Sequence, residues 1–180
     1  MERNLTHIAL FAALIAVLGF VPAISLGFGV PITAQSMGIM LCGTVLGSWR
    51  GALAVLLFLA LTALGLPLLA GGRGGVGVFA GPTVGFLVGF PVAAFVAGLV
   101  IERWRVGVLP AALAGAVLGG IVVLYAFGIP GIALVAGMPI GKAFWGAMVF
   151  VPGDVLKAVL AALVTQGVAR ARPGALLSRA

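Results

Sequence analysis

Charged residues are scarce in this sequence: they make up 7% of its 180 residues, whereas a soluble domain carries about 25%. Hydrophobic residues make up 63%, and the mean hydropathy is +1.35. Because so few polar side chains cannot cover a globule in water, the composition predicts an integral membrane protein. The apolar runs are longer than a barrel strand and do not alternate, which indicates helices rather than a β-barrel.

Acidic residues, histidine and cysteine are scarcer still, and this limits the chemistry available. The acids are Glu2, Glu102 and Asp154, and there is one histidine, His7, and one cysteine, Cys42. The chain has no carboxylate pair, metal cluster or base-activated nucleophile of the kind that hydrolases and phosphotransferases use. A single cysteine also excludes a disulfide within one chain. We therefore predict that the protein is not an enzyme and holds no metal and no cofactor.

The net charge is +7, but the basic residues stand singly between apolar runs, which argues against a nucleic-acid-binding patch. In membrane proteins such residues set the topology, because short loops rich in Lys and Arg remain in the cytoplasm. With the N-terminus inside, seven basic residues are cytoplasmic and two are outside, namely Arg3, Arg50, Arg103, Arg105, Arg170, Arg172 and Arg179 against Arg73 and Lys142. We expect both termini in the cytoplasm and a multi-pass protein of the inner (cytoplasmic) membrane.

The apolar runs predict one membrane domain over residues 1–180, an all-α bundle of six transmembrane helices. The expected spans are 5–21, 32–46, 52–66, 82–101, 108–127 and 153–168. A signal peptide is the alternative for the first run. Tight turns are expected at Gly47–Gly51 and Glu102–Arg105. Gly128–Val151 is less regular, and its apolar piece Ala143–Val151 is too short to span, which predicts a short helix at the outer face.

The stretch Gly65–Gly81 is dominated by glycine, and Gly72–Gly77 formally matches G-x-G-x-x-G. No βαβ unit or suitably spaced acid accompanies it, and no Gly-Lys-Ser/Thr follows, which argues against dinucleotide and phosphate loops. So many glycines instead indicate backbone packed closely over a site, or a mobile lid. Its candidate ligand-binding residues are Gly75 and Arg73. The alternative for Arg73 is a solvated loop residue or a contact to a lipid headgroup.

Asp154 and Lys157 are opposite charges on one face of the last apolar helix. Each charge costs roughly 2.5–3.5 kcal/mol at a membrane centre. The predicted topology places both near the outer surface, and a carboxylate is favoured at a helix N-terminus. The pair predicts a site for a small, mostly apolar solute with a urea- or amide-like head, because the carboxylate accepts N–H bonds and the ammonium donates to a carbonyl. An ion pair that only joins helices is the alternative.

Further polar and aromatic residues are candidates for the same site. Thr33 and Gln35, at the mouth of the second span, either cap the helix or face a ligand. Phe86 either belongs to the core or lines a cavity beneath the glycine stretch. Tyr125 is either an interfacial anchor or a hydroxyl of the site.

Small residues at four-residue spacing mark close helix packing. Gly85 and Gly89 form such a pair, as do Gly115 and Gly119. The first span carries two further pairs, made by Ala9, Ala12, Ala13 and Ala16. These alanines either pack inside the bundle or form a docking face for another helix.

Four segments together resemble the BioY family, the biotin-specific S components of energy-coupling-factor (ECF) transporters: Pro31–Gln35, Gly71–Gly77, Gly81–Phe86 and Pro152–Lys157. The resemblance implies a six-helix bundle whose outer site, closed by the first and third loops, captures biotin with high affinity. It implies that Asp154 and Lys157 hold the ureido ring. The family commonly has Gly-Gly-Tyr where this chain has Val84-Gly85-Phe86, so a phenol contact is lost and Phe86 packs as an apolar wall.

The resemblance also implies partners. The alanine face of the first span would dock a transmembrane coupling subunit that is bound to two cytoplasmic ATPases. ATP would then be used by the partner subunits and not by this chain. The alternatives are an S component for another small vitamin, and a proton-coupled carrier that uses Asp154 as a titrating group. A homo-oligomer is left open.

Overall fold

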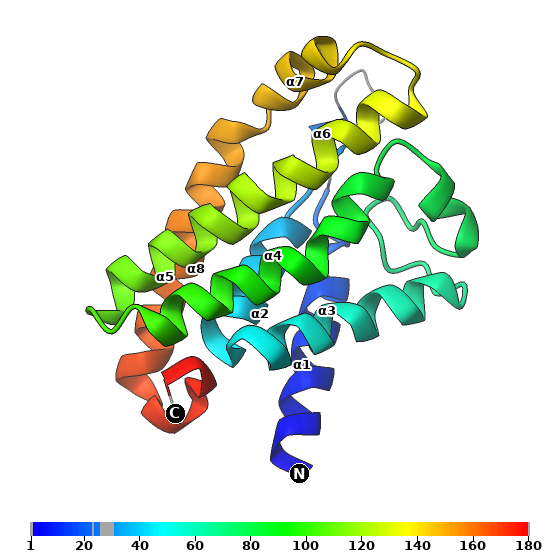
Figure 1. The fold of residues 1–180 in the computed structure, drawn as a ribbon. Coiled ribbons are helices and arrows are strands. Elements are labelled where there is room, and N and C mark those ends of the chain that lie inside the picture. Colours follow the sequence, from blue (N-terminus) through cyan, green and yellow to red (C-terminus); the bar gives the residue numbers. More distant parts are fainter. Residues whose placement is uncertain (1, 23, 26–30, 180) are drawn as a thin grey trace.

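The computed structural model describes residues 2–22, 24–25 and 31–179, and these form a bundle of helices (Figure 1). The α-helices are α1 (Glu2–Leu18), α2 (Gln35–Leu46), α3 (Ser48–Ala63), α4 (Val84–Arg103), α5 (Val108–Val117), α6 (Leu124–Val135), α7 (Ile140–Met148) and α8 (Val151–Ala171). In Figure 1, α1 begins and the chain ends at one end of the bundle, whereas α7 lies at the other end.

Shorter elements complete the chain. Two-residue strands, β1 (Ile24–Ser25) and β2 (Pro31–Ile32), pair antiparallel. The helical segment η2 (Leu118–Val123) joins α5 and α6. The remaining short helices are η1 (Val76–Ala80), η3 (Pro173–Ala175) and η4 (Leu177–Arg179). The predicted outer loop from Pro22 to Pro31 lies largely outside the described residues.

Three helical runs in the described part of the chain are long and apolar enough to cross a membrane: Val84–Arg103, Val108–Val135 and Val151–Ala171. The other apolar helices are shorter: α2 has 12 residues and α3 has 16, whereas a crossing needs about 20. Each of the six expected spans therefore contains a helix, but only three of the described helices reach spanning length.

Helix α2 lies at the centre of the bundle, in contact with α1, α3, α4, α5 and α8. Every residue of α2 except Met37 is buried. Irregular backbone at membrane depth is tolerated where protein rather than lipid surrounds it. The short length of α2 is therefore compatible with a membrane protein, because other helices enclose both of its ends.

Several predicted helix boundaries are wrong by a few residues, and the end of the fifth span is wrong by eight. The residues before Gln35 form β2 and a turn rather than helix, and α4 begins at Val84, so Pro82 is not in its first turn. The predicted tight turn at Gly47–Gly51 shrinks to Gly47 alone, because α3 begins at Ser48.

The largest correction concerns residues 128–135, which the sequence suggests are irregular. They continue the fifth span as α6, so that residues 108–135 form one helical run of 28 residues. Pro130 lies inside α6. Because proline lacks an N–H and usually disrupts a helix interior, the sequence indicated that the helix ends before it. The expected short helix is confirmed as α7, which begins three residues earlier than predicted.

The glycine pairs pack as predicted. A Cβ atom at Gly85 or Gly89 would run into Phe127 of α6, and one at Gly115 or Gly119 would run into the backbone of α4. These glycines let α4, α5 and α6 approach more closely than larger residues would permit.

At the end of the bundle near the chain termini, Glu102 caps α3. Its carboxylate accepts hydrogen bonds from the backbone N–H and the hydroxyl of Ser48, both at 2.8 Å. The predicted charged turn therefore has a structural role, because a carboxylate at a helix N-terminus satisfies free N–H groups and is favoured by the helix dipole.

The chain after α8 folds back onto the same end of the bundle. Leu176 and Leu177 are buried, and the Ser178 hydroxyl donates to the carbonyl oxygen of Thr44 at 2.6 Å. Arg50 donates to the carbonyl oxygen of Leu177 at 3.3 Å. In the sequence, this tail stands out only by its basic residues.

A prediction follows from the contact between α2 and α4. A Cβ atom at Gly43 would lie 2.7 Å from the Ala97 Cβ and 2.9 Å from the Gly98 nitrogen. We expect Gly43→Ala to lower the thermal unfolding temperature in detergent, because overpacking costs about 1–3 kcal/mol. The control is Gly167→Ala in α8, where a Cβ meets no atom within 4 Å. It should leave the unfolding temperature unchanged or raise it, and equal effects of the two changes would contradict the packing account.

Candidate functional site

The site is built around Asp154 in the first turn of α8. Pro152, which lacks an N–H, suits the helix start, and Asp154 follows in the same turn, where the helix dipole favours its charge. Only 5% of Asp154 is exposed. One turn later the Lys157 ammonium forms an ion pair of 2.9 Å with the Asp154 Oδ1 atom. The predicted pairing of these two residues is confirmed.

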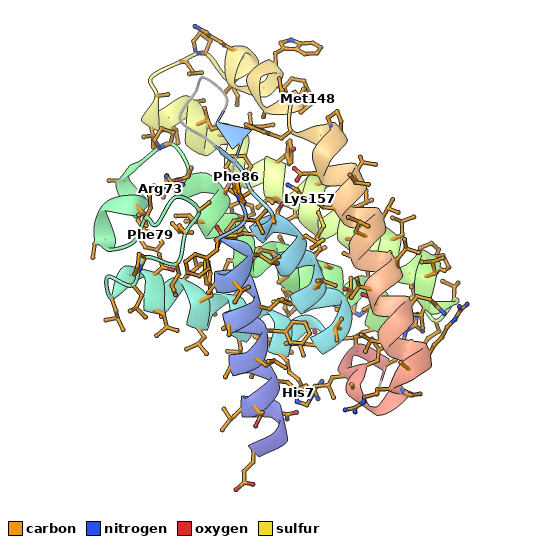
Figure 2. The ribbon with its side chains drawn as sticks, turned by 180° about the vertical axis from the view of Figure 1, so that it is seen from behind. His7, Arg73, Phe79, Phe86, Met148 and Lys157 are labelled. Carbon is orange, nitrogen blue, oxygen red and sulfur yellow. The ribbon has the colours of Figure 1, made fainter. Side chains whose placement is uncertain are left out.

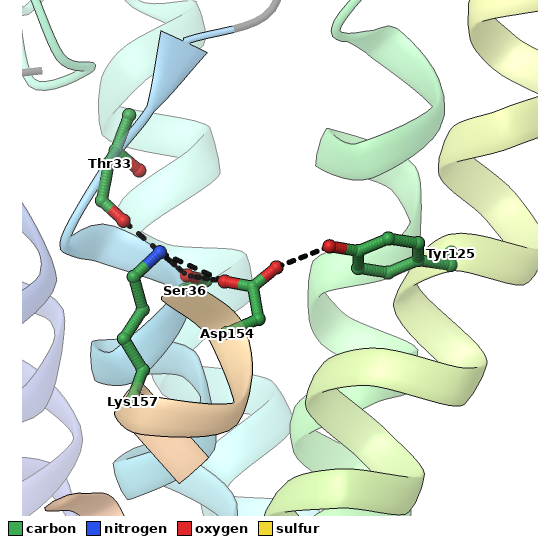
Figure 3. A network of polar contacts seen from close by, with 5 residues as sticks. All are labelled: Thr33, Ser36, Tyr125, Asp154 and Lys157. Atoms are coloured by element: carbon green, nitrogen blue, oxygen red, sulfur yellow. Dashed lines mark hydrogen bonds and ion pairs between the residues drawn. The ribbon is translucent and has the colours of Figure 1, made fainter. Parts of the chain in front are cut away.

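Two hydroxyl groups complete the coordination of this carboxylate (Figure 3). The Ser36 hydroxyl of α2 donates to Asp154 Oδ1 at 3.2 Å and accepts a hydrogen bond from the Lys157 ammonium at 3.0 Å. The Tyr125 hydroxyl of α6 donates to Asp154 Oδ2 at 2.6 Å. Helices α2, α6 and α8 thus meet at one carboxylate.

Tyr125 therefore belongs to the site rather than to a membrane interface. It is 5% exposed, and its ring stands edge to face against Phe86 with ring centroids 6.1 Å apart. The ring is buried between α4 and α8 with its hydroxyl group on Asp154, which favours the site-hydroxyl interpretation over an exposed interfacial anchor.

A cavity opens beside this network. Polar groups line one part of it, and apolar side chains line the rest. Its lining consists of Thr33, Gln35, Ser36, Arg73, Thr83, Tyr125, Asp154 and Lys157 together with Leu69, Phe86, Leu87, Phe90, Leu124 and Phe150. This combination of an apolar wall and a few convergent polar groups is typical of small-molecule sites.

The cavity volume is about 80 Å³, whereas sites for small molecules typically enclose 300–1,000 Å³. A solute larger than a few atoms therefore requires side chains or a covering loop to move aside. Among the described residues, loop 64–83 is in a position to do this, because its residues Leu69, Arg73 and Thr83 line the cavity.

Gln35 fastens that loop to the bundle. Its amide nitrogen donates to the carbonyl oxygens of Ile15 at 3.2 Å and Leu68 at 3.0 Å, and its amide oxygen accepts from the Ala70 backbone N–H at 3.1 Å. The side chain is 2% exposed. Gln35 lines the cavity, but its polar atoms are committed to positioning the loop.

The other candidates fall into two groups. Arg73, Phe86 and Lys157 lie at one level of the molecule, far from His7 (Figure 2), and all three line the cavity. Thr33 lines it as well. Gly75 does not: its backbone N–H donates to the Thr62 carbonyl oxygen at 2.8 Å, and its positive φ of 80° begins the η1 turn. The glycine conformation there shapes the loop and does not contact the cavity.

Arg73 brings a second cation to the cavity from the loop. Its Nε donates to the Ala70 carbonyl oxygen at 3.2 Å, and its backbone pairs with Leu69 in an isolated β-bridge. These contacts hold the Nε atom of the guanidinium group at the cavity. The terminal nitrogens of the group are suited to binding an anion.

The alanines of α1 divide between the core and the surface. Ala12 is 3% exposed and packs inside the bundle, and Ala16 is half-buried against the core, whereas Ala9 and Ala13 are exposed. Ala12 is therefore unavailable to a partner helix, because its side chain already contacts neighbouring helices.

The sequence analysis did not identify Ser36. A serine one residue after Gln35, inside an otherwise apolar helix, was a signal for it. Thr83 and the apolar lining residues had no such signal, because nothing distinguishes Leu69, Phe90 or Phe150 from other core residues in the sequence.

In chemical terms, the site retains capacity for a ligand. An ammonium carries three N–H donors, and two from Lys157 are used by Ser36 and Asp154 among the described residues. The carboxylate has about four acceptor positions, of which three are used. A remaining donor beside a remaining acceptor fits a group that has both an N–H and a C=O. Fold and site together define a helical membrane protein that recognises a small solute.

Comparison with known proteins identifies the family. The sequence profile of the BioY family matches residues 2–174. A relative from Rhodobacter capsulatus, named biotin transporter BioY, is 60% identical over 99% of this chain and 100% of its own length. A biotin transporter BioY from Rhizobium etli is 56% identical over 92% of each chain. This chain belongs to the BioY family.

A solved structure has the same fold. The crystal structure of the S-component for biotin from an ECF-type ABC transporter superposes with a TM-score of 0.89, at 32% identity, over 94% of this chain and 92% of that one. The predicted family and S-component fold are therefore confirmed. Because family and relatives are transporter components, the prediction that the protein is not an enzyme is confirmed as well.

The role of Gln35 gives a prediction about the loop. We expect Gln35→Leu to speed amide hydrogen exchange in residues 68–73 at least about tenfold, because the two hydrogen bonds that join Gln35 to this loop, of about 1 kcal/mol each, are lost. Exchange in α4 should stay unchanged. Thr33→Val is the matched control, since it alters a neighbouring lining residue without touching these bonds. Unchanged exchange in residues 68–73 would show that another contact holds the loop.

Proposed function

We propose that this chain captures biotin at the outer face of the cell membrane as the substrate-binding subunit of an ECF-type transporter. The observation that carries the proposal is the Asp154–Lys157 pair, which Ser36 and Tyr125 hold at the edge of a mostly apolar cavity. The names of the relatives support the choice of biotin, because the residues alone fit other solutes with a urea- or amide-like head.

The chemistry of biotin matches the polar end of the cavity. Its ureido ring carries two N–H donors and one carbonyl oxygen. The N–H groups would donate to the Asp154 carboxylate, and the carbonyl oxygen would accept from the Lys157 ammonium. Such charge-assisted hydrogen bonds are roughly twice as strong as neutral ones, which suits high-affinity capture from dilute solution.

The rest of the ligand matches the remaining walls. The thioether ring and the methylene chain of biotin are apolar and would pack against Phe86, Phe90 and Leu124. The carboxylate at the end of the chain would reach Arg73 on loop 64–83. Binding would therefore draw the loop over the cavity, because the ligand joins the loop to α8. Gly75 would contribute by shaping this loop.

The membrane arrangement that we propose has six crossings and both termini in the cytoplasm of the inner membrane. The distribution of Lys and Arg supports it, since the basic residues gather near the two chain ends and the turns on that side. The shared location of the start of α1 and of η4 at one end of the bundle also supports it. The cavity would then open to the outside.

We also propose that the exposed side of α1, with Ala9 and Ala13, docks a transmembrane coupling subunit that is bound to two cytoplasmic ATPases. Small exposed residues support this, because they let a partner helix approach closely. The chain itself would use no cofactor, and ATP would be consumed by the partner subunits.

The first test measures biotin binding to the purified protein in detergent by calorimetry. Asp154→Asn should weaken binding roughly 10- to 150-fold, because a hydrogen bond to a charged group contributes about 1.5–3 kcal/mol. Gln166→Leu, further along α8 and outside the cavity lining, should bind like the wild type.

Thermal unfolding of each variant shows whether it is folded. A folded wild-type protein without measurable biotin binding would overturn the proposal. Stronger stabilisation by a different vitamin would instead identify another substrate of the same class.

The second test concerns assembly. Ala13→Trp on α1 should reduce copurification with the coupling subunit at least about tenfold and leave biotin affinity unchanged, because the large ring blocks close helix approach. Leu163→Trp, on the exposed side of α8, is the control and should assemble normally. Normal assembly of Ala13→Trp would place the coupling surface elsewhere.

A further inference from the structure

A second cavity, apolar and open to the outside of the bundle, lies behind the site. It is a groove of about 670 Å³ between the 108–135 helical run and α7. Its lining consists of Ile121, Val122, Tyr125, Ala126, Ile129, Pro130, Ile140, Gly141, Phe144, Met148 and Val151. Tyr125 has a polar atom, and that hydroxyl is already donated to Asp154. The groove therefore offers a ligand apolar contacts only.

The groove runs along a helix that is long and apolar enough to cross a membrane, and several of its lining side chains are exposed. Val122 is 56% exposed and Ile140 is 63% exposed. A concave apolar surface in this position faces lipid rather than water. A hydrocarbon chain fills such a groove without any polar partner.

A positive charge on α7 indicates which kind of lipid the groove would bind. Lys142 is the only charged residue between Arg105 and Asp154, and it is exposed on α7, next in sequence to the lining residue Gly141. Trp145, three residues later on α7, is 73% exposed. Lys and Trp at the end of an apolar surface are typical of the headgroup level of a membrane. The Lys142 ammonium group at this level would attract the phosphate of an anionic lipid headgroup.

We propose that the groove binds one acyl chain of an anionic phospholipid, whose phosphate contacts Lys142. The chain lies against Tyr125 on the side away from the solute cavity. It fills the space between the 108–135 helical run and α7. The groove shares only Tyr125 among the lining residues of the solute cavity, and the proposal does not depend on the proposed function.

The test uses Trp145 as a fluorescent reporter. In a Trp49→Phe, Trp104→Phe protein, Trp145 is the remaining tryptophan. This protein is reconstituted into phosphatidylcholine vesicles that contain either dibromophosphatidylglycerol or dibromophosphatidylcholine. Half-maximal quenching should need about fivefold less of the anionic lipid, the factor that roughly 1 kcal/mol of attraction per Lys gives.

Two variants distinguish the contribution of the lipid acyl chain from that of the lipid headgroup. Gly141→Leu should abolish the anionic preference by filling the groove, since a Cβ at Gly141 meets no atom within 4 Å and the fold can accept it. Gly167→Leu, equally open on α8, should keep the preference. Lys142→Gln should make the two lipids quench equally.

Equal quenching by the two lipids in the parent protein would overturn the proposal, as would an anionic preference that survives Gly141→Leu. A third outcome would also overturn it. If the two lipids quench Trp145 equally in the isolated protein, and neither lipid quenches it in the assembled transporter, a protein partner covers the groove instead.

Discussion

The Asp154 carboxylate is the charge that the rest of this structure must accommodate. An ionised carboxylate buried among apolar helices is stable only when ion pairing and hydrogen bonds replace its lost hydration. Here Lys157, Ser36 and Tyr125 supply these contacts from α8, α2 and α6. Satisfying one charge thus fixes the relative positions of three helices, and it leaves a donor and an acceptor at the cavity for a solute. The same contacts serve the fold and recognition.

Helix α2 makes this arrangement possible. It is short and almost entirely buried, and it carries polar groups at both ends. At one end Ser36 joins Asp154 and Gln35 holds loop 64–83. At the other end the Thr44 hydroxyl lies 2.8 Å from that of Thr165 in α8. Because hydrogen bonds are stronger in a low-dielectric interior, these contacts join α2 to α8 along their shared length.

Access to the site depends on the loop that Gln35 anchors. The cavity is too small for a whole vitamin, so solute binding and loop position are coupled. Gln35 holds the loop at Leu68 and Ala70, and the positive-φ glycines at 71, 72 and 75 give the loop backbone shapes that other residues rarely adopt. The glycine-rich composition and the buried glutamine therefore both determine how this loop lies at the cavity.

Hydropathy and charge are local properties, so the sequence by itself determined the membrane class, the approximate positions of the helices and the unusual Asp154–Lys157 pair. Tertiary structure decided which residues meet. Ser36 contacts Asp154 because α2 packs against α8, and the Tyr125 hydroxyl reaches the same carboxylate from the 108–135 helical run. Gln35 lines the cavity and also holds loop 64–83 through Leu68 and Ala70. These contacts depend on which helices pack side by side. The hydrophobic periodicity of one segment does not determine which helix packs against it.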